Sequence, residues 1–305
     1  MNSVLLRHSL VCMALAVILL AAGCTELQDN LVAPPQRSQA LTVHPEALAK
    51  TSSSAVFHGK YIREQKWQMS SCWTCHGRNY AGGSSQVSCL TCHSKAGGPE
   101  NCTTCHGSTN PAPPQDIDGN TATTVRTVGA HQVHLTGSGT TNGIRCSECH
   151  QVPQSVYAPG HVDSDPPAEV AFRDSLANTV TNEPTTQDYD VSLPTVTPAT
   201  TWSPSTLKCS NNYCHGDFKN GNNYAPIWTS VGAGEARCGT CHGDVTKATL
   251  AERALPKTSA QGGTHPNTTQ CSVCHVGVVD VNVNIINKAV HMNGRLNVFG
   301  VERDF

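Results

Sequence analysis

Seven segments of the chain place a histidine directly after the second of two cysteines, and in six of them two residues separate the cysteines. Two thiols about one helical turn apart can bond to the two vinyl groups of one porphyrin, and the histidine that follows can bind its iron. The spacing therefore predicts seven sites of covalent c-type haem attachment, numbered here 1 to 7 in chain order. The cysteines are Cys72, Cys75, Cys89, Cys92, Cys102, Cys105, Cys146, Cys149, Cys209, Cys214, Cys238, Cys241, Cys271 and Cys274. The proximal histidines are His76, His93, His106, His150, His215, His242 and His275.

Haem site 5 differs from the others, because four residues separate Cys209 from Cys214. Paired cysteines can also form zinc ribbons, iron–sulfur centres or disulfides. None of these structures requires a histidine after every second cysteine, whereas haem attachment does. We therefore interpret all seven sites, which use 14 of the 16 cysteines, as haem sites.

The histidine count suggests which residues complete the coordination of each haem iron. Of the 15 histidines, His8 lies in an export signal and seven are proximal, so seven remain for seven irons. This match predicts a histidine on both faces of every iron. His131 and His134, three residues apart, could serve two different haems if they lie on one helical turn. The distal candidates are His44, His58, His131, His134, His161, His265 and His291.

The composition does not support a conventional apolar core. Only 5% of the residues are aromatic, 14% are charged, and the chain has 25 Gly and 18 Pro. The 282 residues after the signal, divided among seven sites, give about 40 per haem. We expect a mostly irregular fold organised by its cofactors, with few short helices. The formal charge of −2 argues against nucleic acid as a partner.

The first residues predict export and lipid attachment. Residues 1–23 read as a signal peptide, since the apolar run after Arg7 is too short to span a bilayer stably. Residues 20–24 are similar to a lipobox, in which the peptide is cut before a cysteine that receives lipid, here Cys24. Ordinary cleavage nearby, which would leave Cys24 a free thiol, is the alternative. Residues 24–43 then form a flexible, lipid-anchored linker.

The remaining chain divides into two predicted modules. Residues 44–110 form an N-terminal three-haem module, and residues 111–305 form a four-haem module with a haem-free, Thr/Pro-rich segment at 151–208. In the tail, Val281, Val283 and Ile285 alternate with asparagines, which is typical of a strand. The dipeptide at 293–294, Asn-Gly, predicts the turn of a C-terminal β-hairpin, with Leu296 and Val298 continuing beyond it.

With these motifs in hand, the chain resembles the multihaem c-type cytochromes that mix CxxxxCH with CxxCH sites. The resemblance is carried by residues 209–216, by 161–163 before 168–170, and by 291–294. It implies low-spin haems that conduct respiratory electrons at the outer membrane, often in lipoproteins. The implied partners are other multihaem cytochromes and an outer-membrane porin conduit. The implied location is the periplasmic or cell-surface face of the outer membrane.

An iron with two histidine ligands has no position for a substrate, so the ligand count favours electron transfer over catalysis. Two alternatives stay open. One is a multihaem reductase of a small oxyanion, which requires one five-coordinate haem. The other is the subunit of a polymerised cytochrome filament, in which a histidine such as His44 binds a haem of the neighbouring subunit.

Overall fold

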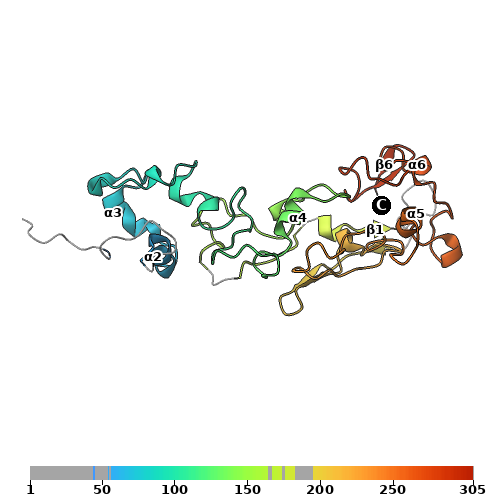
Figure 1. The fold of residues 1–305 in the computed structure, drawn as a ribbon, viewed down its shortest axis with the longest axis horizontal. Helices are drawn as coiled ribbons and strands as arrows, with labels where there is room; N and C mark the ends of the chain where they lie inside the picture. Colours follow the sequence, from blue (N-terminus) through green and yellow to red (C-terminus); the bar gives the residue numbers. More distant parts are fainter. Residues whose placement is uncertain are drawn as a thin grey trace, which may run out of the picture. The chain divides into compact units, whose positions relative to one another are not determined.

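The computed structural model describes residues 44, 54, 56–163, 167–173, 176–182 and 195–304 (Figure 1). The signal peptide (1–23), the linker (24–43) and Cys24 lie outside these residues. Contacts divide the chain into two units, residues 1–61 and 62–305. The module boundary after residue 110 stays a prediction.

Helical structure in the described part of the chain is short. The α-helices are α2 (His58–Glu64), α3 (Trp73–His76), α4 (His131–Thr136), α5 (Leu250–Ala254) and α6 (Cys271–Cys274). Single 3-10 turns are η1 (Met69–Cys72), η2 (Gly83–Ser85), η3 (Cys89–Thr91), η4 (Gly98–Glu100), η5 (Cys102–Thr104), η6 (Cys146–Glu148), η7 (Leu176–Asn178), η8 (Tyr213–His215) and η9 (Ser259–Gln261). Helical turns therefore coincide with the haem motifs of sites 1 to 5 and 7.

The residue before a motif often starts its turn. The side chains of Ser88 and Asn101 accept hydrogen bonds from the backbone N–H two residues on, and Asn212 accepts from the N–H of His215. Such caps satisfy the first N–H groups of a helical turn. The caps at Ser88 and Asn101 therefore fix the turns on which the cysteines of sites 2 and 3 begin, and Asn212, inside the motif of site 5, fixes the turn that carries Cys214 and His215.

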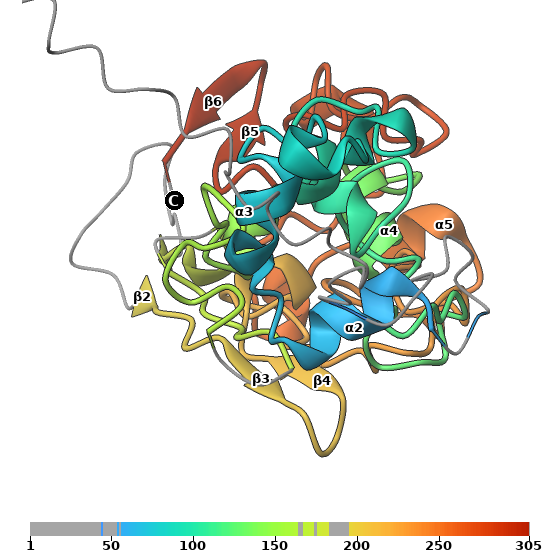
Figure 2. The ribbon, with the colours of Figure 1, turned by 90° about the vertical axis from the view of Figure 1, so that its left-hand side faces the viewer.

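The strands form three two-stranded antiparallel ribbons. β1 (Thr181–Asn182) pairs with β2 (Thr195–Val196), β3 (Thr201–Ser203) with β4 (Lys208–Ser210), and β5 (Leu296–Val298) with β6 (Val301–Arg303). Strands β3 and β4 lie side by side (Figure 2), and their register pairs Trp202 with Cys209. This pairing thereby holds the first cysteine of haem site 5.

The C-terminal hairpin is confirmed, but its turn is not at residues 293–294. The turn is Phe299–Gly300, whose φ angles of 54° and 74° match the two-residue turn that suits the strand twist. Residues 281–285 form no strand, since the carboxylate of Asp280 accepts from the N–H groups of Asn282 and Asn284 and closes a turn. Val281 is accordingly 84% exposed.

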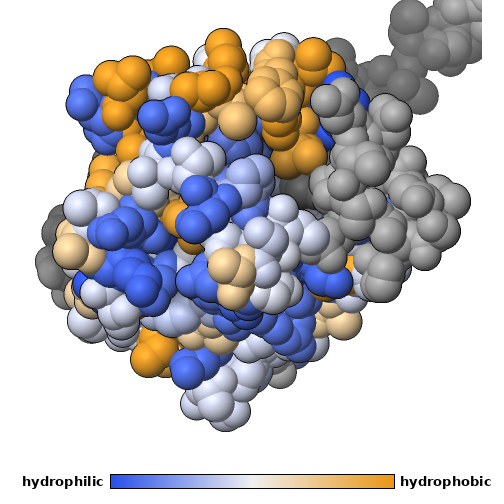
Figure 3. All heavy atoms as spheres, turned by 90° about the vertical axis from the view of Figure 1, so that its right-hand side faces the viewer, coloured by the Kyte–Doolittle hydropathy of each residue, from blue (hydrophilic) through white to orange (hydrophobic). Residues whose placement is uncertain are grey.

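The described residues bury little apolar surface. The buried apolar side chains are Met69, Tyr80, Ala112, Val128, Ala177, Tyr213 and Val278. Other apolar side chains, such as Val273 and Phe299, stay exposed, and Figure 3 shows hydrophobic residues beside hydrophilic ones on the surface. Such a core cannot by itself offset the conformational entropy of the chain. The predicted fold class, mostly irregular with few short helices, is confirmed.

No helix among the described residues has the length and apolar character needed to cross a membrane.

Asp116 organises the loop between haem site 3 and α4. Its buried carboxylate accepts from the N–H groups of Asp118 and Asn120, at 2.9 and 2.8 Å, and from the hydroxyl of Thr127. Burial alone would raise the pKa of Asp116, but these hydrogen bonds outweigh it and hold the pKa below its ordinary value.

Asp116→Asn is expected to lower the stability of this loop most at neutral pH. A carboxyl whose folded pKa is depressed stabilises the fold above its unfolded pKa, about 3.9, and stops doing so as the pH falls through the folded value. Guanidinium unfolding should give a lower free energy of unfolding for Asp116→Asn than for the wild type at pH 7. This difference should become smaller below about pH 4.

Asp118→Asn is the control, because it removes only an exposed ion pair with Arg63. If Asp116→Asn lowered the free energy of unfolding by the same amount at every pH, the role assigned to the Asp116 carboxylate would be wrong.

Candidate haem-binding sites

Five of the proximal histidines face one of the predicted distal histidines. The ring centres lie 6.4 Å apart in His106–His161, 6.3 Å in His131–His150, 6.3 Å in His134–His215, 6.4 Å in His242–His291 and 6.3 Å in His265–His275. These pairs belong to haem sites 3 to 7 in chain order.

The separation fits an iron between the rings. A metal–imidazole bond is about 2.0 to 2.1 Å long, and a ring centre lies roughly 1.1 Å from its nitrogens, so two rings on one metal have centres about 6.3 Å apart. Ordinary aromatic pairs spread over about 4.5 to 7 Å, whereas these five pairs agree to within 0.1 Å on the distance that a shared metal sets. The residues present therefore fit a porphyrin iron held from both faces.

Backbone carbonyls orient most of these rings. A carbonyl oxygen only accepts, so the Nδ1 atom that contacts it carries the proton and leaves Nε2 free for a metal. In the ring pairs, Nδ1 lies 2.7 to 2.9 Å from the carbonyl oxygen for His131, His134, His150, His161, His242, His265, His275 and His291. His106 makes the same contact with Pro111, and so does His76 with Val87, at 3.0 Å.

His215 of site 5 has a different partner. Its Nδ1 lies 3.3 Å from the side-chain nitrogen of Asn212, whose Oδ1 accepts from the backbone N–H of His215. This amide nitrogen can only donate, so Nδ1 of His215 accepts the hydrogen bond, whereas Nδ1 donates to a carbonyl in the other pairs.

Helix α4 serves two haem sites. His131 and His134 lie on this helix, as their spacing suggested, and they face His150 of site 4 and His215 of site 5. Each Nδ1 contacts a carbonyl one turn earlier, Val128 for His131 and Ala130 for His134. The backbone just before the helix thus fixes both rings.

Burial keeps these imidazoles neutral. It lowers the pKa of His215 to about 4, and repulsion from His134 adds to the effect. Burial, followed by His291, His275 and His265, lowers the pKa of His242 to about 4. Burial also lowers the pKa of His131, His134, His265 and His291. Neutral imidazole is the form that binds a metal.

The sites follow one another closely. His106 and His134 both act on the pKa of His131, so sites 3, 4 and 5 are neighbours. The pKa of Cys214, raised mainly by burial to about 12, also reflects Cys149 of site 4 and Cys241 of site 6. His275 acts in the same way on His242, which links sites 6 and 7.

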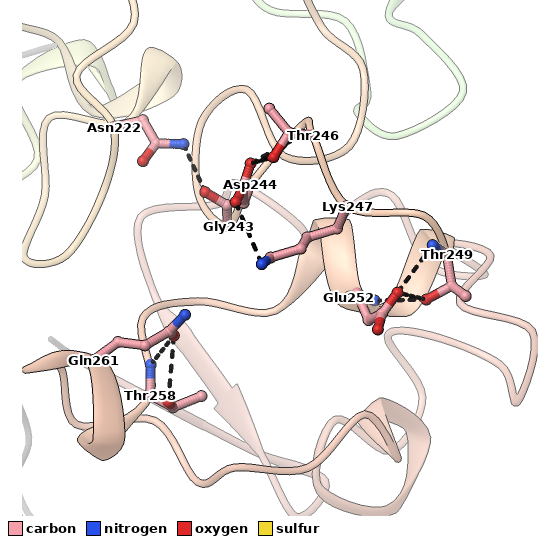
Figure 4. Close-up of polar contacts among 9 residues, drawn as sticks. All are labelled: Asn222, Gly243, Asp244, Thr246, Lys247, Thr249, Glu252, Thr258 and Gln261. Carbon is pink, nitrogen blue, oxygen red and sulfur yellow. Dashed lines mark hydrogen bonds and ion pairs between the residues drawn. The ribbon is translucent and has the colours of Figure 1, made fainter.

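Residues 222–224 clamp site 5 to site 6. The N–H groups of Asn223 and Tyr224 donate to the carbonyls of Gly216 and His215, while that of Asn222 donates to Cys241. The Asn222 side-chain amide lies 3.0, 3.2 and 3.1 Å from the carbonyl oxygens of Gly239, Thr240 and Gly243, the last shown in Figure 4. One asparagine therefore closes the attachment loop of site 6.

The approach of these two loops requires glycine. A Cβ at Gly216 would lie 2.3 Å from the carbonyl oxygen of Cys241, and the φ of Gly216 is +96°. A larger residue there would therefore separate site 5 from site 6.

Helix α5 supplies the acceptor for His242. Thr249 and Glu252 exchange hydrogen bonds at its start, a capping box that satisfies its first N–H groups (Figure 4). The carbonyl of Ala254 near its end then lies 2.9 Å from Nδ1 of His242. The capped turn thereby sets the ring orientation at site 6.

Sites 1 and 2 are described in part. Their proximal residues His76 and His93 lie in the unit 62–305, whereas His44 and His58 lie in the unit 1–61. The distal roles of His44 and His58 stay predictions.

In the part of the chain that the structure describes, no two of the fourteen motif cysteines form a disulfide. No three residues among the described His, Cys, Asp and Glu gather closely enough to hold a metal ion without a porphyrin.

Sequence reasoning missed the carbonyl acceptors, Asn222 and Trp228, whose indole lies against the rings of His131 and His134. Backbone acceptors carry no side-chain signal. For Trp228, the scarcity of tryptophan, four in the chain, was the available hint.

Comparison with protein families gives a match to the Geobacter CxxxxCH...CXXCH motif over residues 208–242. The matched residues are those of sites 5 and 6 with the clamp between them. The match supports a multihaem c-type cytochrome-like protein that binds c-type haem. No curated protein and no solved structure matches the chain significantly.

Asn222→Ala is expected to reduce the free energy of unfolding by about 1 kcal/mol, the net contribution of an ordinary hydrogen bond, because three backbone carbonyls lose their donor. Asn222→Asp should be more damaging, since a carboxylate would face three carbonyl oxygens. Guanidinium unfolding monitored by haem absorbance measures both changes.

The exposed Asn282, whose backbone N–H donates to Asp280, provides the control. Asn282→Ala should change stability by about 0.5 kcal/mol or less. Equal effects of Asn222→Ala and Asn282→Ala would show that the clamp does not hold site 6.

Proposed function

We propose that the chain binds seven c-type haems, each with two histidine ligands, and transfers electrons along them. The observation that carries the proposal is the set of five histidine pairs at 6.3 to 6.4 Å. A bound haem supplies one-electron exchange at its iron.

The distal ligands are assigned from the ring pairs. His161 serves site 3, His131 site 4, His134 site 5, His291 site 6 and His265 site 7. His44 and His58 remain for sites 1 and 2, which completes seven distal ligands for seven sites.

The chain's own residues account for a conducting role. Histidines on both faces exclude substrate and water from the iron, and the carbonyl contacts fix each ring and increase its basicity. The clamp at residues 222–224 and helix α4 hold successive sites close together. Proximity and fixed ligands are what electron transfer between neighbouring centres requires.

We also propose that the protein is exported and attached through a lipid on Cys24 to the outer membrane. Its partners are other multihaem cytochromes and a porin conduit. The lipobox-like residues 20–24 and the resemblance to outer-membrane cytochromes support this placement.

His291→Gly is expected to open one iron, that of site 6, to external ligands. The wild-type protein should be entirely low-spin, whereas the variant should show one high-spin haem in seven that binds cyanide. Added imidazole should restore the low-spin spectrum, which separates a lost ligand from misfolding.

Intact mass and a haem assay of the wild type provide the reference, with seven haems and a lipidated Cys24 as the expected result. Fewer than six haems, or a high-spin iron in the wild type, would contradict the proposed function.

The ring-plane angles predict two spectral classes. The planes meet at 9° in site 7 and 21° in site 4, but at 70° in site 6 and 88° in site 3. In low-spin ferric haem, parallel imidazole planes give a rhombic electron paramagnetic resonance (EPR) spectrum, and crossed planes give one large principal g value. Sites 4 and 7 should be rhombic, and sites 3 and 6 should show the large g value.

Single substitutions assign the EPR signals to sites. His161→Met should remove a large-g signal, that of site 3, and His265→Met should remove a rhombic signal, that of site 7. A spectrum with rhombic signals alone would refute the arrangement of sites 3 and 6.

A further inference from the structure

Trp228 contacts the distal histidines of two successive haem sites. Its ring centre lies 4.8 Å from that of His131, edge to face at 86°, and 5.6 Å from that of His134, stacked at 21°. One indole therefore packs against the ligands assigned to sites 4 and 5.

The indole is held on its α4 side by the segment before the helix. Its Nε1–H donates to the carbonyl of Arg126 at 2.8 Å. A Cβ on Gly129 would lie 1.9 Å from Nε1, so only glycine allows this approach. The next residues lead directly into the turn that carries both histidines.

The backbone of Trp228 is held by the hairpin of site 5. Its N–H donates to the carbonyl of Leu207 at 2.7 Å, and Ile227 bridges to Lys208 at the start of β4. The ring of Trp202, on β3, lies edge to face against the indole at 6.1 Å. Trp228 thus connects the strand that carries Cys209 to the helix that carries both distal ligands.

We propose that Trp228 is a positioning residue that sets the ring orientations of His131 and His134, and with them the electronic states of haems 4 and 5. The inference rests on the proposed bis-histidine ligation. An imidazole bound to iron can still rotate about its metal–nitrogen bond. Its Nδ1–carbonyl contact and the packed indole together restrict that rotation.

The structural consequence is the angle within each pair, 21° at site 4 and 51° at site 5. Without the indole, each ring keeps its carbonyl contact but loses the surface against which it rests. Both angles should then change, while the angles at sites 3, 6 and 7 should not.

The test is EPR of the fully oxidised, haem-loaded protein. His131→Met and His134→Met, each of which should remove one signal, identify the signals of sites 4 and 5. Trp228→Leu is expected to shift the g values of these two signals and of no others. Trp228→Phe keeps a ring but loses the bond to Arg126, so it should shift the same signals by less.

Gly129→Ala tests the contact from its other side. Its methyl group would displace the indole, so the same two signals should shift although Trp228 is present. If Trp228→Leu does not incorporate all its haems, the g values of Gly129→Ala and Trp228→Phe test the proposal instead.

Trp73→Phe is the control, because the ring of Trp73 lies against Tyr80 and Tyr157 and has no described ring contact with Trp228 or with the histidines of sites 4 and 5. It should leave the g values of sites 4 and 5 nearly unchanged.

Unshifted signals in fully loaded Trp228 and Gly129 variants would overturn the proposal. So would equal shifts at all sites, or shifts of sites 4 and 5 as large with Trp73→Phe. A wild type with fewer haems or with high-spin iron would instead refute the proposed function, before any variant is examined.

Discussion

Two imidazoles can share one iron only when their rings face each other at a fixed separation, and this requirement governs the arrangement of the chain. Five histidine pairs meet it to within 0.1 Å of one another, although their members are 10 to 81 residues apart in sequence. Little else could hold such distant segments together, because the described part of the chain buries few apolar side chains. In the proposed arrangement the ligand bonds replace a hydrophobic core.

The connections between sites are as specific as the sites themselves. Helix α4 carries the proposed distal ligands of sites 4 and 5, and residues 222–224 join the loops of sites 5 and 6 through backbone hydrogen bonds. Helix α4 and residues 222–224 are both short segments. Each would fix the spacing of neighbouring haem sites with only a few residues. The family match over residues 208–242 includes the second of these segments.

Much of this could be predicted from the sequence. The cysteine spacings, the surplus of seven histidines and the poor apolar content indicated the attachment sites, the ligand candidates and the irregular fold. The pairing of histidines could not be predicted, because it depends on how distant segments meet. The strand predicted over 281–285 was wrong, because hydrogen bonds to the Asp280 carboxylate outweighed the alternation of Val281 and Val283. The hairpin turn predicted at 293–294 was also wrong, since the turn lies at Phe299–Gly300. The carbonyls that orient the rings could not be predicted either, because every residue has a backbone carbonyl whatever its side chain.

Those carbonyls have a consequence for how such a protein can change over time. A peptide oxygen is present whatever side chain a residue bears, so a substitution at one of these acceptor residues leaves the hydrogen-bond partner of the ring in place. The acceptor residues can therefore change while the Nδ1 contact of the ring is retained. Site 5 is the exception, because the amide of Asn212 faces its ring and a single codon change there alters the partner. At that site the Nδ1 partner is itself open to selection.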